Sequence, residues 1–328
     1  MTAAPRLTRP PVYQVFSGSG PWLMLLAGLG LIGFAFGFHG DGWQWPDLND
    51  PLFNGLRLPR LLSALLVGAA LAGAGAALQA LFRNPLVDPG MIGTSSGAML
   101  GAIGVMALGW DSMGMPFAAF VGGLAVTWLL LLFNRLLDGG ELGLLVLGLV
   151  IGSFASAVCG LVLFLSDDLT LRGATTWLSG HLGNSAAAPL WLAAPVSIAG
   201  LLILWWQGRD LDCLLLGEDE AISLGIDLPA LRRWTALGAA LAVGGAVTLA
   251  GLVGFVGMMV PNACALWLGG SRRRLIGISA VVGAVFLLGM DTLARGAVYP
   301  VDLPVGLLAA LVGPPFFLWL FLRRRGER

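Results

Sequence analysis

The sequence predicts an all-α polytopic membrane protein with about ten transmembrane helices in each subunit. Of the 328 residues, 57% are hydrophobic, only 11% are charged, and the formal net charge is zero. A soluble domain of this length could not bury so much apolar surface, whereas a bilayer requires it. The 49 glycines fit the same class, because glycine lets membrane helices approach one another closely.

Each crossing takes about 20 apolar residues, and ten runs in the sequence approach that length. In chain order the predicted spans cover residues 22–38, 61–82, 93–108, 117–136, 142–165, 190–206, 234–250, 255–268, 275–297 and 306–322. The stretch before the first run is polar and lacks an early apolar core, so we expect that run to stay in the membrane uncleaved. Because the connecting loops are short, residues 1–328 are predicted to form one transmembrane domain.

The arginines predict the orientation of these spans. All 18 basic residues are arginine, and the spans divide them unequally between the two sides of the membrane. On one side lie only Arg57, Arg60, Arg172 and Arg295. On the other side lie Arg6, Arg9, Arg83, Arg135, Arg209, Arg232, Arg233, Arg272, Arg273, Arg274, Arg323, Arg324, Arg325 and Arg328. The positive-inside rule places the arginine-rich side, together with both chain termini, in the cytoplasm.

The missing residue types exclude several chemistries. A phosphate-binding P-loop needs its lysine and a Schiff-base enzyme needs an amine, so any ATP that drives this protein must be hydrolysed by a partner chain. Three cysteines without CxxC spacing and two histidines, His39 and His181, make a protein-built metal site improbable. We expect no catalytic residue and no cofactor on this chain.

One polar segment, residues 217–227, interrupts the apolar runs. Glu218, Asp219 and Glu220 fill the first turn of a short predicted helix, a brief apolar stretch follows, and Gly225 supplies the stop. Asp227 and Pro229 are typical start signals for the next helix. A short helix at the cytoplasmic surface of a membrane protein favours docking of a soluble partner, and the alternative is an ordinary solvated charge run.

Several motifs, found in one order along the chain, carry a family resemblance. They are Arg57-Leu58-Pro59-Arg60 before a helix of small residues, Arg83-Asn84-Pro85-Leu86-Val87-Asp88-Pro89, the polar segment, Gly254-Phe255-Val256-Gly257-Met258-Met259-Val260-Pro261, Asp291-Thr292-Leu293-Ala294-Arg295 and Leu303-Pro304-Val305-Gly306. Over nearly its whole length the sequence resembles the FecCD family of ATP-binding-cassette (ABC) importer permeases, which take up iron–siderophores, haem and vitamin B12. The resemblance implies the type II importer permease fold in a bacterial inner membrane. It also implies a second copy of the chain, two ATPase subunits that hold ATP and Mg, and a periplasmic binding protein.

The resemblance assigns docking of the binding protein to Arg57, Arg60 and Arg295, because family members pair arginines at these motif positions with carboxylates of that protein. A guanidinium stays charged and can hold a carboxylate through two hydrogen bonds. The alternative is anchoring at the membrane interface, where Asp291 would be a ready intrahelical partner four residues before Arg295.

In the family, the position of residues 217–227 is the coupling helix, which sits in a groove of the ATPase subunit. The coupling residues are accordingly predicted to be Gly217, Glu218, Ala221, Leu224 and Gly225.

The resemblance also places a cytoplasmic gate at Asn84 and Leu86 and, by alignment, at Glu141 and Leu142. Glu141 departs from the small hydroxyl residues of the vitamin B12 type, and an ordinary acid at a helix N-terminus is an equally good reading of it.

Two further features bear on the pathway. Residues 172–181 match a short re-entrant periplasmic helix, on which Trp177 and His181 could line the substrate pathway. A surface or packing role is the favoured reading of His181, although imidazole can ligate haem iron. Asn262 stands where the family usually has histidine, and Asp302 where it has glutamate, so the family's basic pair near Asn262 cannot be carried over.

The sequence therefore predicts a permease subunit that moves an iron chelate or a corrinoid and catalyses no reaction, with membrane lipid but no nucleic acid among its partners. A self-contained secondary transporter of a small solute is the alternative. Such a transporter would normally carry ionisable residues inside its spans, and Asp291, near a helix end, is almost the only one here.

Overall fold

The computed structural model describes residues 20–38, 42–45, 47, 49–109, 114–137, 140–183 and 187–326. Within these ranges every regular element is a helix, and the only β-type pairing is an isolated bridge between Phe38 and Trp43. The α-helices are α1 (Gly20–Gly37), α2 (Leu58–Leu81), α3 (Thr94–Ala107), α4 (Gly114–Leu136), α5 (Gly140–Phe164), α6 (Asp168–Leu178), α7 (Ala187–Leu214), α8 (Glu218–Ser223), α9 (Leu228–Ala250), α10 (Val256–Leu268), α11 (Arg272–Gly296) and α12 (Val305–Gly326). A π-helical turn, η2 (Phe53–Arg57), precedes α2, and a 3-10 turn, η3 (Pro89–Ile92), precedes α3.

Each of the ten predicted apolar runs overlaps one α-helix, and the two short helices α6 and α8 account for the re-entrant and polar segments. The main error lies in α7, which continues to Leu214 although the predicted span ends at residue 206. Its last two turns are charged on one side, but Leu211 and Leu214 are fully buried on the other, so packing extends the helix after hydropathy has fallen.

Within the described residues, six helical stretches are long and apolar enough to cross a membrane: Phe53–Leu81, Gly114–Leu136, Gly143–Phe164, Pro189–Leu214, Leu228–Ala250 and Arg272–Gly296. Four further apolar helices are shorter: Leu26–Gly37, Thr94–Ala107, Val256–Leu266 and Val305–Trp319. The fold is therefore that of a polytopic membrane protein.

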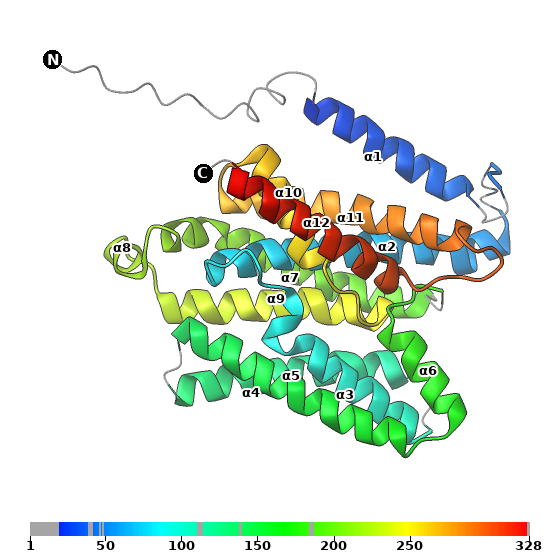
Figure 1. The fold of residues 1–328 in the computed structure, drawn as a ribbon, viewed down its shortest axis with the longest axis horizontal. Coiled ribbons are helices and arrows are strands. Elements are labelled where there is room, and N and C mark those ends of the chain that lie inside the picture. Colours follow the sequence, from blue (N-terminus) through cyan, green and yellow to red (C-terminus); the bar gives the residue numbers. More distant parts are fainter. Residues whose placement is uncertain are drawn as a thin grey trace.

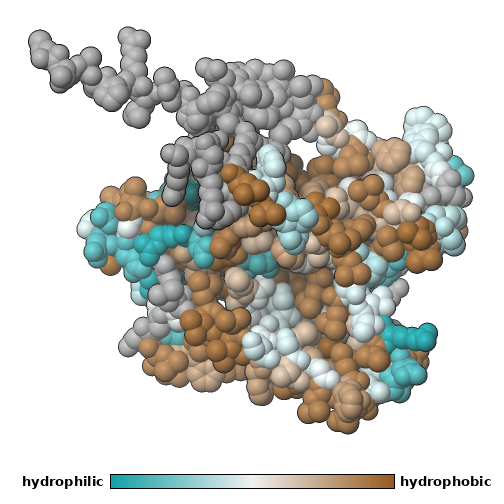
Figure 2. Space-filling model, in the orientation of Figure 1, coloured by the Kyte–Doolittle hydropathy of each residue, from teal (hydrophilic) through white to brown (hydrophobic). Residues whose placement is uncertain are grey.

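The long helices run roughly along one direction, with α6 at one end of the bundle and α8 at the other (Figure 1). We call these the α6 end and the α8 end. Hydrophilic residues gather at both ends, and hydrophobic ones cover most of the face between them (Figure 2). This distribution matches a bundle whose two ends meet water and whose flank meets lipid.

Helix α2 forms the centre of the bundle, packed against α11, α9, α7 and α10. Its small residues are buried inside this chain, which favours intramolecular packing over a pore-lining or dimer face as the reason for the glycine- and alanine-rich run. At two crossings there is no room for a side chain: a Cβ on Gly68 would overlap the carbonyl oxygen of Gly283 on α11, and one on Gly75 would overlap that of Gly257 on α10. Glycine at these positions lets the backbones touch.

Replacing Gly75 with alanine is expected to destabilise the protein by about 1–3 kcal/mol, because the added methyl group forces α2 and α10 apart. The measurement is the thermal unfolding midpoint of the detergent-purified protein. Gly104→Ala on α3 is the matched control, since a Cβ there has nothing within 4 Å. Equal midpoints for the two variants would show that the α2–α10 crossing tolerates a side chain.

Candidate functional site

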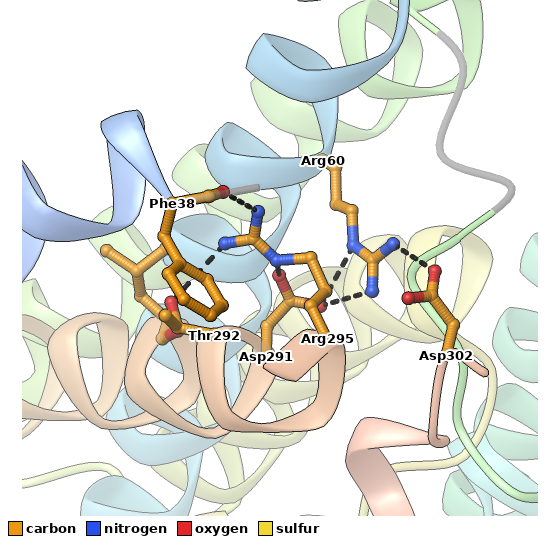
Figure 3. Close-up of polar contacts among 7 residues, drawn as sticks. Phe38, Arg60, Asp291, Thr292, Arg295 and Asp302 are labelled. Atoms are coloured by element: carbon orange, nitrogen blue, oxygen red, sulfur yellow. Dashed lines mark hydrogen bonds and ion pairs between the residues drawn. The ribbon is translucent and has the colours of Figure 1, made fainter. Parts of the chain in front are cut away.

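A cluster of charged residues from three parts of the chain lies at the α6 end (Figure 3). Arg60, in the first turn of α2, donates from Nε to Oδ1 of Asp291 on α11 at 3.0 Å and from Nη1 to Oδ2 of Asp302 at 2.6 Å. Arg295, one turn after Asp291, brings its Nε to 3.2 Å from Oδ2 of the same carboxylate. Its Nη1 also donates to the carbonyl oxygen of Phe38, at 3.0 Å. The cluster thus ties α2, α11, the end of α1 and the approach to α12 together.

The burial of this cluster explains its composition. The Asp291 side chain is fully buried, and those of Arg60 and Arg295 are only 13% and 11% exposed. A buried carboxylate is costly unless it is paired and hydrogen-bonded, and two guanidinium groups supply this pairing. The intrahelical Asp291–Arg295 pair is present, as the anchoring alternative for these arginines required.

The predicted docking arginines therefore differ from one another. The side chains of Arg60 and Arg295 are nearly buried and pair with Asp291 inside the protein, whereas Arg57, at the end of η2, is partly exposed. Among the residues that the structure describes, no hydrogen bond or ion pair of the Arg57 side chain is found. Asp302 is the outermost member of the cluster, with its side chain 42% exposed.

The polar segment folds at the α8 end as the sequence predicted, into a short helix with a glycine stop. The amide of Gly225 donates to the carbonyl of Ile222 at 2.9 Å, and that of Ile226 to the carbonyl of Ala221 at 3.0 Å. These two bonds form a Schellman motif, which requires a left-handed residue, and Gly225 has φ +87°. The predicted start of the next helix is also confirmed, since the Asp227 carboxylate accepts from the amide of Ala230 at 3.0 Å.

Helix α8 presents one face to the protein and another to the outside. Ala221 is fully buried, whereas the side chains of Ile222 and Leu224 are 57% and 60% exposed. Glu218, among the predicted coupling residues, is partly exposed and pairs with two arginines of this chain: its Oε1 lies 3.1 Å from Nη2 of Arg83, and its Oε2 lies 3.0 Å from Nη2 of Arg232. Two exposed aliphatic side chains beside exposed acids form a compact surface suited to a protein partner.

Residues 83–88, which we call the gate turn after the predicted gate residues Asn84 and Leu86, join α2 to η3 near α8. The Asn84 side chain accepts from the amide of Leu86 at 2.9 Å, an Asx turn that folds the segment back. Leu86 itself is exposed. Glu141 and Leu142, the other predicted gate residues, lie in the first turn of α5, and their side chains are outside the described part of the structure.

Two amide side chains that sequence reasoning did not assign hold the gate turn. Asn262 on α10 donates to the carbonyl of Pro85 at 2.7 Å, and Gln79 on α2 donates to that of Val87 at 3.4 Å. Asn262 is buried although it sits in an apolar helix, and a buried amide needs a partner. A polar amide within an apolar helix was the signal that the sequence offered for Asn262. The sequence could not indicate which backbone carbonyl this amide contacts.

Trp177 lies on helix α6 and His181 lies just after it; these are the two residues that the sequence placed in the substrate pathway. Helix α6 begins four residues before the predicted segment, because the Asp167 side chain caps it by accepting from the amide of Leu169 at 3.2 Å. Trp177 is buried in the core, and His181 follows the helix, with its amide donating to the carbonyl of Ala250 at 2.8 Å. Burial, and then the positive charge of Arg60, lower the pKa of His181, so its imidazole is neutral at pH 7. Among the described residues no group of three or more His, Cys, Asp or Glu side chains could hold a metal ion.

Known proteins resemble this chain along most of its length. The hemin transport system permease protein HmuU of Yersinia pestis is 39% identical over 293 residues, which cover 85% of this chain and 86% of that protein. The vitamin B12 import system permease protein BtuC of Vibrio cholerae is 39% identical over 286 residues, 85% of each chain. A probable iron chelatin transport system permease protein of Helicobacter pylori is 36% identical over 274 residues, 83% of this chain and 82% of that one.

The fold leads to the same group of proteins. A chain from a metal-chelate type ABC transporter, solved in an inward-facing conformation, superposes with a TM-score of 0.83 at 29% identity, covering 92% of this chain and 98% of its own. The relatives are named as permeases of transport systems, so this chain is a transport subunit and not an enzyme. The model of the FecCD transport family matches residues 22–323. On that match and on these relatives, the chain belongs to the FecCD transport family.

Proposed function

We propose that this chain is the membrane-spanning subunit of an ABC importer that carries an iron chelate, as a siderophore complex or haem, or a corrinoid from periplasm to cytoplasm. Separate ATPase subunits, holding ATP and Mg, power the movement. The observation that carries the proposal is α8, a capped helix with an exposed aliphatic face at one end of an apolar bundle. A membrane protein that is driven by ATP but has no P-loop lysine needs a surface on which a separate ATPase subunit can dock.

The proposed topology has ten membrane helices, the α8 end in the cytoplasm and the α6 end in the periplasm of a bacterial inner membrane. The six long apolar helices support this topology. The arginine distribution also supports it, because most arginines lie toward the α8 end and the positive-inside rule places the arginine-rich end in the cytoplasm. The four shorter helices would complete the count. Both termini would then be cytoplasmic.

The proposed assembly is two copies of this chain, two ATPase subunits and one binding protein. Helix α5 supports the second copy, because it presents large apolar side chains such as Leu149, Phe154 and Phe164 to the outside of the monomer. Lipid or a second copy could cover such a face. The pathway would then run between the two copies, with the gate turn at its cytoplasmic end.

The rival function is a secondary transporter that needs no ATPase. Its best candidate for ion coupling is Asp291, the acid inside α11. That carboxylate is fully buried and forms ion pairs with Arg60 and Arg295, so its two oxygens are already engaged inside this chain and are not open to a coupling ion. The cluster therefore supports the importer.

Replacing Arg57 with glutamate is expected to weaken docking of the binding protein about tenfold or more, because it puts like charge opposite the partner's carboxylate. Binding of the purified binding protein to the detergent-solubilised permease, measured against ionic strength, checks this. Arg172→Glu is the matched control, an exposed arginine on α6 outside the predicted docking set. Unchanged affinity in Arg57→Glu would leave docking to other residues.

The proposal itself is tested by mild-detergent purification of the tagged protein from its native membranes after crosslinking, with mass spectrometry of the recovered chains. We expect a P-loop ATPase and a periplasmic binding protein, and the ligand carried by that binding protein would identify the substrate. Recovery of this chain alone would favour the self-contained transporter.

A further inference from the structure

We infer that Glu218 joins the coupling helix to the gate turn, so that displacement of α8 is passed to residues 83–88 through the Glu218–Arg83 ion pair. The inference rests on the proposed function, because it gives α8 and the gate turn their roles. It assigns Glu218 and Arg83 as positioning residues within this chain, whereas the sequence placed Glu218 in the contact with the ATPase.

The geometry of Glu218 carries the inference. It is the first residue of α8, and its two carboxylate oxygens reach different elements: Oε1 lies 3.1 Å from Arg83 of the gate turn and Oε2 lies 3.0 Å from Arg232 of α9. One carboxylate thus bridges segments 135 residues before it and 14 residues after it in the chain. Asp219 and Glu220, the other acids of this turn, are exposed.

Arg83 is placed to move the gate turn as a unit. It is the first residue of that turn, immediately before Asn84, and has φ +48°, a conformation that a residue with a side chain seldom adopts. The turn behind it is closed by the Asn84–Leu86 hydrogen bond and tied to α10 by Asn262. Because the Asn84–Leu86 hydrogen bond makes the turn compact, we expect a pull on Arg83 to reach both of these residues.

The two faces of α8 have different contacts: one is open to a partner subunit, and the other contacts the rest of this chain. Ile222 and Leu224 point outward, where a partner can press on them, while Glu218 lies toward Arg83. All three side chains of the ion-pair network are partly exposed, so the bridge adds little to the stability of the fold. Its loss should therefore leave a folded protein in which α8 and the gate turn move independently.

The test measures substrate transported per ATP hydrolysed, in vesicles holding the complete complex of permease, ATPase and binding protein. Arg83→Gln and Glu218→Gln are each expected to lower this ratio about fivefold or more, while the ATPase rate, co-purification of the ATPase and the unfolding midpoint stay at wild-type values. The double variant should transport as much substrate per ATP as either single variant, because each single substitution already removes the Glu218–Arg83 ion pair. Arg83→Lys, which keeps the charge, should retain most of the coupling.

A wild-type ratio in Arg83→Gln would overturn the inference, and so would loss of the ATPase from the Glu218→Gln complex, which would make Glu218 a contact of that subunit. Failure of the proposed function looks different: the wild-type complex would then show no ATP-dependent transport at all, and the inference would fall with it.

Discussion

Replacing Asp291 with asparagine is expected to destabilise the protein by about 3–5 kcal/mol, the usual cost of removing one partner from a buried ion pair. The variant keeps the shape of the side chain but leaves the Arg60 and Arg295 guanidiniums facing each other without the charge that separates them. Both are almost fully buried, so water cannot substitute for the carboxylate. A large drop in the thermal unfolding midpoint of the purified protein, and low recovery from membranes, are the expected readouts.

Asp302→Asn is the matched control for this prediction. Asp302 pairs with the same Arg60, but its side chain is 42% exposed, so water can replace much of what it supplies. We expect a loss of less than about 1 kcal/mol for this variant. Equal midpoints for the two variants would mean that Asp291 is not the centre of the cluster.

Replacing Gly225 with valine is expected to reduce transport about tenfold or more while ATP hydrolysis continues, a loss within the usual range of coupling free energies. Gly225 stands at φ +87°, where a β-branched residue is strongly disfavoured, and its amide closes the Schellman motif of α8. Without that closure α8 cannot keep the orientation in which Ile222 and Leu224 face outward. Transport and ATPase rates in the reconstituted complex are the measurements.

Gly225→Asn separates backbone conformation from size. Asparagine tolerates the left-handed region and serves at this helix position in other proteins, so this variant should keep most of the transport activity. Because a Cβ at residue 225 has nothing within 4 Å, loss of activity in the asparagine variant could not be blamed on crowding inside this chain. Coupled transport at the wild-type level in Gly225→Val would refute the role given to this residue.

The elements of the fold were largely predictable because hydropathy and capping act locally. The spans follow apolar runs, the stop at Gly225 follows from its conformational freedom, and the start of α9 follows from Asp227. The errors lie where packing overrides hydropathy, as in the last turns of α7, where Leu211 and Leu214 hold a charged helix against the bundle.

The candidate site was predictable only in its local contacts. Asp291 and Arg295 are four residues apart, so their pairing could be expected from helical spacing. Arg60 reaches the same carboxylate across 231 residues, and Glu218 reaches Arg83 across 135. Nothing in one sequence states which distant residues meet, so the burial of two predicted docking arginines and the pairing of Glu218 with Arg83 came from the tertiary fold.

The measurement that tests the central claim most directly is uptake of ligand, delivered by the co-purified binding protein, into vesicles containing the complete complex. The account predicts that uptake requires ATP on the side of the membrane where the ATPase subunits lie. Uptake should stop when the P-loop lysine of the ATPase subunit is replaced with alanine, and it should continue when the proton gradient is collapsed. Uptake that ignores ATP and the lysine substitution but fails when the gradient is collapsed would contradict it, and would make this chain a self-contained secondary transporter.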